Sequence, residues 1–141
     1  MRKSFLDTNL IVYANDARDP AKQARAIAVV TQAMRDGTGV ISTQVMQEYA
    51  VVAAGKLRQD PDTILRQLLL LESLEVVLVT PALIRRGLEL QFRYQLDYWD
   101  ASILAAAEHA QCNVLLSEDL SPGQLYVTIR IENPFLVESA G

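Results

Sequence analysis

Cysteine and histidine are almost absent from this chain. Its 141 residues include one cysteine, Cys112, and one histidine, His109. A single thiol cannot form an intramolecular disulfide, and the apolar run that follows Cys112 predicts a buried, structural side chain. The chain therefore has no cluster of histidine and cysteine of the kind that zinc sites use.

Long apolar runs and an excess of basic residues are also missing. No stretch reaches the roughly 18 apolar residues of a membrane span, and Asp7 interrupts the N-terminal apolar segment before a signal peptide could form. We therefore expect a cytoplasmic protein without membrane contact. The net charge of -4 and the pI of about 4.9 argue against passive nucleic-acid binding. They allow an enzyme whose clustered acids hold cations.

The order of apolar patterns predicts one α/β domain over residues 1–141. Half of the residues are hydrophobic and 21% are charged, which is typical of a globular chain. Short strand-like runs alternate with longer helical patterns, which indicates crossover units. We therefore expect a three-layer α/β/α sandwich with a mostly parallel central sheet. The predicted strands are residues 4–7, 39–42, 74–79, 113–116 and 125–131. The predicted helices are residues 20–36, 43–54, 61–71, 81–95 and 97–110, with a helical turn at 9–15.

Two acids follow predicted strands from opposite ends of the sequence. Asp7 lies at the end of the first strand, and Asp119 comes just after the strand at 113–116. In an open parallel sheet, ligands bind beyond the carboxyl ends of the strands. Both acids should therefore lie at the same edge of the sheet.

Three further acids lie near the starts or apolar faces of predicted helices. Glu48 borders the apolar stripe of its helix, where it could also be a rim residue that packs its methylenes on the core. Asp97 and Asp100 can serve as N-cap and first-turn acid of one helix. The flanking residues of Asp100 predict a largely buried position, where an unpaired carboxylate is costly.

Carboxylates that converge on one pocket raise each other's pKa values, and a divalent cation relieves this repulsion. Oxygen ligands without histidine or cysteine suit Mg²⁺ or Mn²⁺ better than zinc. Such an ion can activate a water molecule for attack on a phosphate. The chemistry indicated by these acids is phosphodiester hydrolysis.

Other catalytic arrangements fail at a defining residue. A Ser-His-Asp hydrolase would depend on His109 near the end of a helix, and no Gly-x-Ser-x-Gly turn is present. Phosphatases of the haloacid dehalogenase type need a second acid where Asn9 stands. A response-regulator receiver needs a late lysine, but no lysine follows Lys56.

Five sequence pieces, in order along the chain, resemble the PIN-domain ribonucleases, and more narrowly the VapC-like toxins of bacterial toxin–antitoxin pairs. The pieces are Phe5-Leu6-Asp7-Thr8-Asn9, Gln47-Glu48, Tyr98-Trp99-Asp100-Ala101-Ser102-Ile103, Leu116-Ser117-Glu118-Asp119-Leu120 and Ile131-Glu132-Asn133-Pro134-Phe135. Each piece is weak by itself, but the ordered set is specific.

This resemblance implies a metal-dependent endoribonuclease with four catalytic acids. By that likeness, Asp7 and Asp100 would be the main ligands of Mg²⁺ or Mn²⁺, and Glu48 and Asp119 would complete the site directly or through water. The hydroxyls of Thr8 and Ser117 would steady the acids or the scissile phosphate, while Asp97 stays a supporting acid or a helix cap. The likeness also implies a homodimer and an antitoxin partner that covers exposed apolar surface.

The RNA substrate would need local basic groups, because the whole chain is acidic. Arg58 and the group Arg85, Arg86 and Arg93 are candidates, although a solvated helix face is the commoner explanation for any one of them. The alternative to an enzyme is a catalytically silent PIN-like module that binds RNA or protein. Such a module would be expected to have lost one or more of the four acids.

Overall fold

The computed structural model describes residues 2–136, which form six helices and six strands within that range. The strands are β1 (Ser4–Leu6), β2 (Gly39–Ser42), β3 (Glu75–Val77), β4 (Val114–Leu116), β5 (Leu125–Tyr126) and β6 (Ile129–Glu132). The helices are α1 (Thr8–Ala14), α2 (Pro20–Asp36), α3 (Thr43–Gly55), α4 (Pro61–Leu71), α5 (Pro81–Tyr94) and α6 (Tyr98–His109). Every predicted helix is therefore present, within a residue or two of its expected ends.

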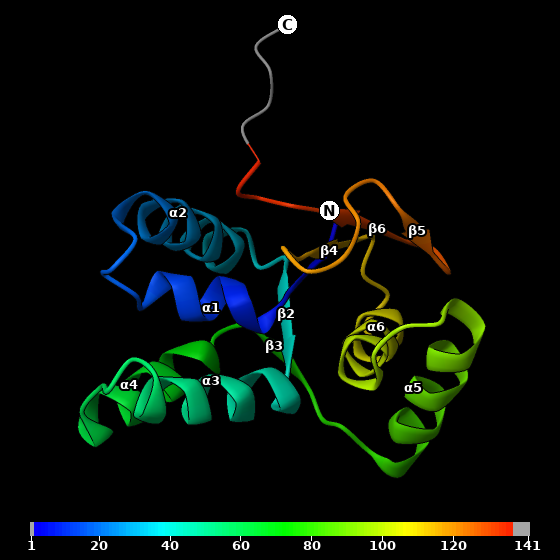
Figure 1. Cartoon of the computed structure of the whole chain (residues 1–141), viewed down its shortest axis with the longest axis horizontal. Coiled ribbons are helices and arrows are strands. Elements are labelled where there is room, and N and C mark those ends of the chain that lie inside the picture. Colours follow the sequence, from blue (N-terminus) through cyan, green and yellow to red (C-terminus); the bar gives the residue numbers. More distant parts are fainter. Residues whose placement is uncertain (1, 137–141) are drawn as a thin grey trace, which may run out of the picture.

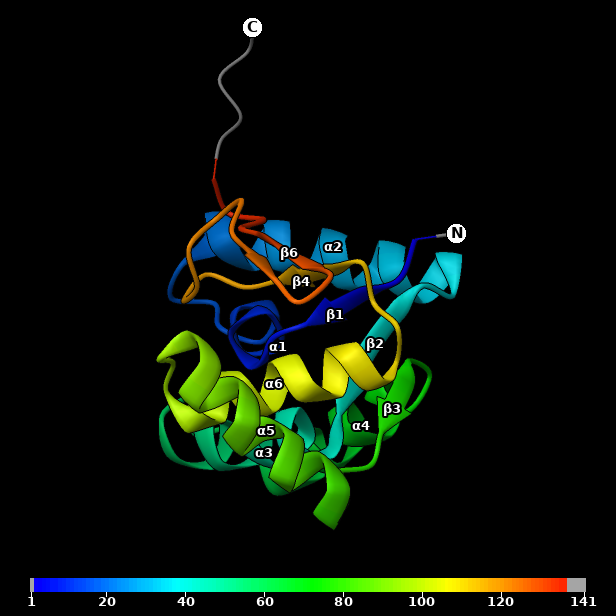
Figure 2. The ribbon, with the colours of Figure 1, turned by 90° about the vertical axis from the view of Figure 1, so that its right-hand side faces the viewer.

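The strands form one mixed, mostly parallel sheet in the order β3-β2-β1-β4-β6-β5. All neighbouring strands run parallel except β5, which pairs antiparallel with β6. Figure 1 shows α1 and α2 on one side of the sheet and α5 and α6 on the other; α3 and α4 lie near α1. Figure 2, turned by 90°, shows α5 in front of α6, which runs alongside β1 in this view. The predicted three-layer α/β/α architecture is confirmed.

The core includes the sheet and buried residues of the helices on both of its sides, and α6 contributes a large part of it. All residues from Ala101 to Ala107 are buried, so this helix is apolar around most of its circumference. Its small side chains let neighbours approach closely: a Cβ on Gly87 of α5 would lie 3.3 Å from the Cα of Ser102. Because α6 is enclosed on several sides, the acid in its first turn has a fixed position.

The expected last strand is in fact a hairpin. Residues 127–131 alternate between apolar and polar side chains and follow the apolar pair Leu125-Tyr126, which predicts one continuous strand. The chain instead turns between β5 and β6 at Val127, whose φ is 57° and whose N–H donates to the hydroxyl of Tyr94 at 2.8 Å. This turn contains no glycine or asparagine, so the sequence carries no signal for it.

Cys112 is buried, as its sequence context predicts, and burial raises the pKa of its thiol to about 12. A protonated, enclosed thiol is a poor nucleophile. In the part of the chain that the structure describes, no helix combines the length and the apolar character needed to cross a bilayer.

Gly39 lets β2 pass close to the end of α2. A Cβ at this position would lie 2.6 Å from Leu74 Cδ2 and 2.8 Å from Ala33 Cβ. Both distances are too short for carbon atoms in contact, so the neighbouring side chains would have to move. We expect Gly39→Ala to lower the free energy of unfolding by about 1–3 kcal/mol through overpacking, measured by urea denaturation.

The matched control is Gly55→Ala in α3. A Cβ at Gly55 would meet nothing within 4 Å, and alanine is the better helix former, so stability should stay the same or rise by up to about 1 kcal/mol. Equal losses in both variants would show that the close contact at Gly39 is not the cause.

Candidate active site

Asp7 is placed where β1 ends and α1 begins. Its N–H donates to the carbonyl oxygen of Leu116 in the neighbouring strand β4 at 3.1 Å. Its carboxylate Oδ1 accepts the N–H of Thr8 at 2.7 Å and caps α1. The side chain is therefore held at the carboxyl edge of the sheet by backbone contacts on both sides.

The four predicted acids line one pocket at this edge, with a volume of about 210 Å³. Asp7 is contributed by the end of β1, Glu48 by α3, Asp100 by α6 and Asp119 by the loop after β4. The remaining lining residues are Thr8, Asn9, Val12, Gln44, Val52, Lys56, Trp99 and Ile103. Residues from opposite ends of the sequence thus meet here.

Asp7 is the most buried of the four acids, with 7% of its surface exposed. The pKa of its carboxyl is raised to about 6, mainly by burial and to a smaller extent by the negative charges of Asp119 and Asp100. Hydrogen bonds from Ser117 and Thr8 act in the opposite direction. Without a cation, Asp7 is therefore partly protonated near neutral pH.

Ser117 connects Asp7 to Asp119. Its buried hydroxyl donates to Asp7 Oδ2 at 2.7 Å and accepts the N–H of Asp119 at 3.1 Å. One hydroxyl therefore fixes both the orientation of the first acid and the path of the loop that contributes the last one.

Glu48 is half-buried and held from two sides. The hydroxyl of Thr8 donates to its Oε1 at 3.2 Å, and the amide of Gln44, one helical turn earlier, donates to the same oxygen at 3.0 Å. The Gln44 amide also donates to the carbonyl oxygen of Trp99 at 3.1 Å, so it ties α3 to the first turn of α6. These contacts favour a site role for Glu48 over a simple rim position.

Asp100 and Asp97 have different places at the start of α6. Asp97 is exposed and caps the helix by accepting the N–H of Trp99 at 3.0 Å, and it does not line the pocket. Asp100 lines the pocket, and its pKa is raised by burial and then by the charges of Asp97, Asp119 and Glu48. The capping interpretation thus fits Asp97 and the site interpretation fits Asp100.

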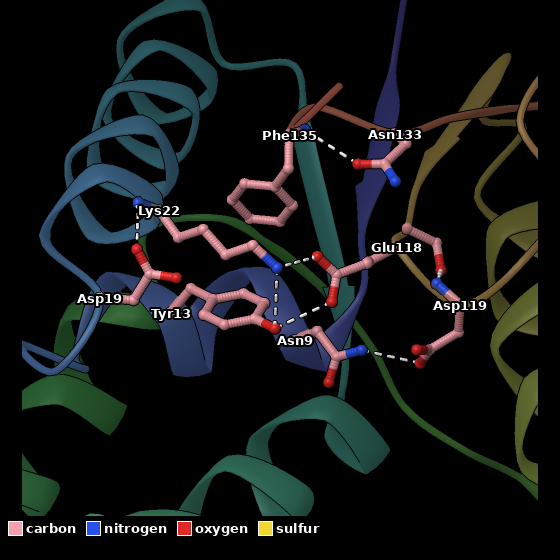
Figure 3. A network of polar contacts seen from close by, with 9 residues as sticks. Asn9, Tyr13, Asp19, Lys22, Glu118, Asp119, Asn133 and Phe135 are labelled. Carbon is pink, nitrogen blue, oxygen red and sulfur yellow. Dashed lines mark hydrogen bonds and ion pairs between the residues drawn. The ribbon is translucent and has the colours of Figure 1, made fainter. Parts of the chain in front are cut away.

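The loop after β4 is held by two side chains of α1, as Figure 3 shows. Asn9 donates to Asp119 Oδ2 at 2.7 Å. One helical turn later, the Tyr13 hydroxyl donates to Glu118 Oε1 at 2.8 Å, and Lys22 of α2 forms an ion pair with the same carboxylate. The two consecutive acids are thus both held by α1, Asp119 through Asn9 and Glu118 through Tyr13.

Lys22 and Tyr13 affect the charge state of Glu118. Burial raises the pKa of Glu118, but the hydrogen bonds from Lys22 and Tyr13 outweigh it and bring the pKa below its usual value. The ammonium group of Lys22 lies 4.5 Å from the centre of the Tyr13 ring and 5.3 Å from that of Phe135. Phe135, from the closing Asn-Pro-Phe segment, therefore contributes an aromatic ring to the group of side chains that holds Glu118.

Sequence reasoning missed several residues of the site. Asn9 and the anchor of Glu118 have no local sequence signal, because their partners lie far away along the chain. Gln44 could have been found, since it stands four residues before Glu48 on the same helix face. Lys56, a basic residue lining the acid pocket, was also missed.

The donor set of the pocket fits a hard divalent cation. Four carboxylates, the Thr8 hydroxyl and the side-chain amides of Asn9 and Gln44 supply oxygen, and the pKa values of Asp7 and Asp100 are raised as expected for acids that lack a counter-ion. Between residues 2 and 136, no three acids, histidines or cysteines lie close enough together to hold a metal ion as their side chains stand. Mg²⁺ is commonly bound by one or two carboxylates and completes its shell with water, so such a site needs no tighter cluster.

Several solved structures share the fold of this chain, although no curated protein matches its sequence. The chain resembles a toxin–antitoxin complex from Klebsiella pneumoniae, with 20% identity, a TM-score of 0.69, and 96% of this chain and 100% of that chain covered. It also resembles DNA-bound VapBC from Salmonella typhimurium, with 18% identity, a TM-score of 0.69, and coverage of 95% and 99%.

A third similar structure is VapC20 of Mycobacterium tuberculosis, a toxin that cleaves the sarcin–ricin loop. It shares 17% identity and a TM-score of 0.64, and the match covers 83% of this chain and 92% of that one. The family model of the PIN domain matches residues 4–124. By this match over most of its length, the chain belongs to the PIN domain family.

Proposed function

We propose that this chain is an endoribonuclease that uses Mg²⁺ or Mn²⁺ to hydrolyse phosphodiester bonds of RNA. The observation that carries this proposal is the pocket where Asp7, Glu48, Asp100 and Asp119 meet. Two of these acids have raised pKa values, so their pocket favours a cation. Membership of the PIN domain family supports the same reaction.

In this proposal, Asp7 and Asp100 hold the ion directly, and Glu48 and Asp119 act directly or through water. When bound, the ion lowers the pKa of the attacking water and neutralises charge on the phosphate. Ser117 keeps the Asp7 carboxylate oriented, and Thr8 with Gln44 does the same for Glu48. The ammonium group of Lys56 is suited to contact a phosphate oxygen at the rim of the pocket.

The proposed biological role is the toxin of a toxin–antitoxin pair. VapC20 of Mycobacterium tuberculosis is a toxin that cleaves the sarcin–ricin loop, and the Klebsiella pneumoniae structure is a toxin–antitoxin complex. Both share the fold of this chain over most of its length. An antitoxin would restrain the activity by covering surface near the acids.

Two exposed apolar surfaces support protein partners. On α5, Ile84, Leu88 and Phe92 recur every fourth residue and are 49%, 47% and 67% exposed. On α4, Leu65 and Leu69 are 65% and 69% exposed. We propose that these two surfaces bind a second copy of the chain and the antitoxin, because single exposed apolar residues are common on protein surfaces but stripes of them are not.

Light scattering that gives the mass of a single chain would contradict the dimer.

Cleavage should depend on the pocket acids. We expect Asp7→Asn and Asp100→Asn each to reduce the rate of RNA cleavage on the order of 100-fold or more at saturating Mg²⁺ or Mn²⁺, because each removes a charge that holds the ion. Single-turnover cleavage of a structured RNA measures this effect, and excess chelator should abolish the wild-type reaction.

The matched control for cleavage is Asp62→Asn, at an exposed acid in the first turn of α4. It should keep full activity. If both pocket variants also keep full activity, the assignment of the acids is wrong. A folded wild-type protein that cleaves no RNA with any divalent ion would instead indicate a silent binding module.

Without a cation, the contribution of Asp7 to the free energy of unfolding should fall as pH rises. The folded-state pKa of Asp7 is about 6, above the ordinary aspartate value of 3.8, so the folded protein binds more protons than the unfolded chain between these values. The resulting loss of stability is complete above about pH 6 and absent below about pH 4. We expect Asp7→Asn to raise the free energy of unfolding by at most about 3 kcal/mol at pH 8 in chelator.

At pH 4 the gain from Asp7→Asn should disappear, and at pH 8 added Mg²⁺ should stabilise the wild type more than the variant. Urea denaturation at both pH values gives these differences, with Asp62→Asn as the control. A variant that is less stable than wild type at pH 8 in chelator would show that the cap and hydrogen bonds of Asp7 outweigh its charge.

A further inference from the structure

We propose that a second groove, beside the acid pocket, binds a single strand of RNA and leads it to the catalytic acids. This proposal rests on the proposed ribonuclease function and names the surface that recognises its substrate. The groove has a volume of about 970 Å³. It lies between α2 and the end of β6 with the segment that follows it, Asn133–Leu136.

The groove concentrates positive charge in an acidic protein. Four basic residues line it, namely Arg2, Lys22, Arg25 and Arg130, and Glu132 is the one acid among its described lining residues. This local excess of positive charge contrasts with the whole chain, whose net charge is -4. A polyanion is the ligand that such a surface favours.

Two of the four basic residues already have carboxylate partners. Arg2 pairs with Glu132 at 3.3 Å, and Lys22 pairs with Glu118. Arg25 and Arg130 are exposed, and within residues 2–136 neither forms an ion pair. The Nε of Arg25 donates to the carbonyl oxygen of Pro134 at 2.9 Å, which fixes the guanidinium at the groove wall. These two arginines are therefore the groups placed to contact phosphates.

The groove runs along the strands toward the acid pocket. Arg130 is in register with Val114 and Ser4, at the starts of β4 and β1. Two residues later, Glu132 is in register with Leu116 and Leu6, directly before Ser117 and Asp7. Lys22 and Phe135 also line the groove, and Figure 3 shows Glu118 between Lys22 and Asp119. A strand lying in the groove would thus arrive at the loop that contributes Asp119.

The floor of the groove suits nucleobases. The partly exposed side chains of Leu116, Pro134 and Phe135 give it an apolar and partly aromatic lining. Unpaired bases pack on such surfaces while their phosphates reach basic groups at the rim. Among the basic residues that the sequence suggested, Arg86 is less suited, because it is committed to Glu108 and Glu89 at 2.7 and 3.1 Å.

The test compares two double variants of the full chain with the same change in net charge. Arg25→Gln with Arg130→Gln removes two exposed charges of the groove, and Arg35→Gln with Arg66→Gln removes two exposed charges elsewhere. Both pairs are made in the Asp100→Asn background, so that a fluorescent, unstructured RNA of about 12 nucleotides stays intact, a length within the usual span of single-strand sites. Fluorescence anisotropy then gives the affinity and its dependence on salt.

We expect the groove pair to weaken RNA binding several-fold and to lower the slope of log affinity against log salt by about 1.4, or about 0.7 for each lost phosphate contact. The control pair should change neither by more than its error. Without the Asp100→Asn change, the groove pair should raise KM for RNA cleavage and leave kcat unchanged.

Equal effects of the two pairs would overturn the groove assignment, and so would a glutamate peptide of equal length that displaces the RNA as well as unlabelled RNA does. If the groove pair has no effect but the parent protein cleaves RNA, the groove assignment fails and the proposed function stands. If the groove pair weakens binding but the parent protein cleaves nothing, the groove stands and the proposed function fails.

Discussion

The burial of a carboxylate at the start of α1 is the constraint on which this site depends. Asp7 must cap a helix, meet the end of β4 and stay next to other negative charges, all in a nearly closed position. In water such a group would ionise freely, but here burial and neighbouring charges oppose ionisation. In the function proposed above, a cation relieves this conflict by favouring the ionised carboxylates.

The acids keep their positions because neutral or basic partners hold them. Ser117 holds Asp7, and Thr8 with Gln44 holds Glu48. Along α1, Asn9 and Tyr13 stand one turn apart and hold the consecutive acids Asp119 and Glu118. Three of the acids thus come from the strands and helices, while the loop after β4, which is held by hydrogen bonds from α1, contributes the fourth. Preorganisation of this kind lowers the cost of placing ligands around an ion.

The sequence predicted the parts of the fold that depend on local patterns. Strand–helix alternation indicated the layers, and the rule that ligands bind beyond the carboxyl ends of parallel strands placed Asp7 and Asp119 together. The hairpin at Val127 was not predictable, because its positive φ is imposed by tertiary contacts with Tyr94 and not by a turn residue. Likewise, the pairs Asn9–Asp119 and Lys22–Glu118 join distant segments, and no local pattern encodes such contacts.

The most direct test of the shared cation site is an NMR titration of the Asp7 side-chain carboxyl carbon, with and without Mg²⁺. In chelator, we predict a pKa of about 6 for this group. At saturating Mg²⁺, the pKa should fall below about 4, because a bound ion favours the ionised form. A pKa near 3.8, the ordinary aspartate value, that does not change with Mg²⁺ would contradict the claim that Asp7 is a buried ligand of a cation.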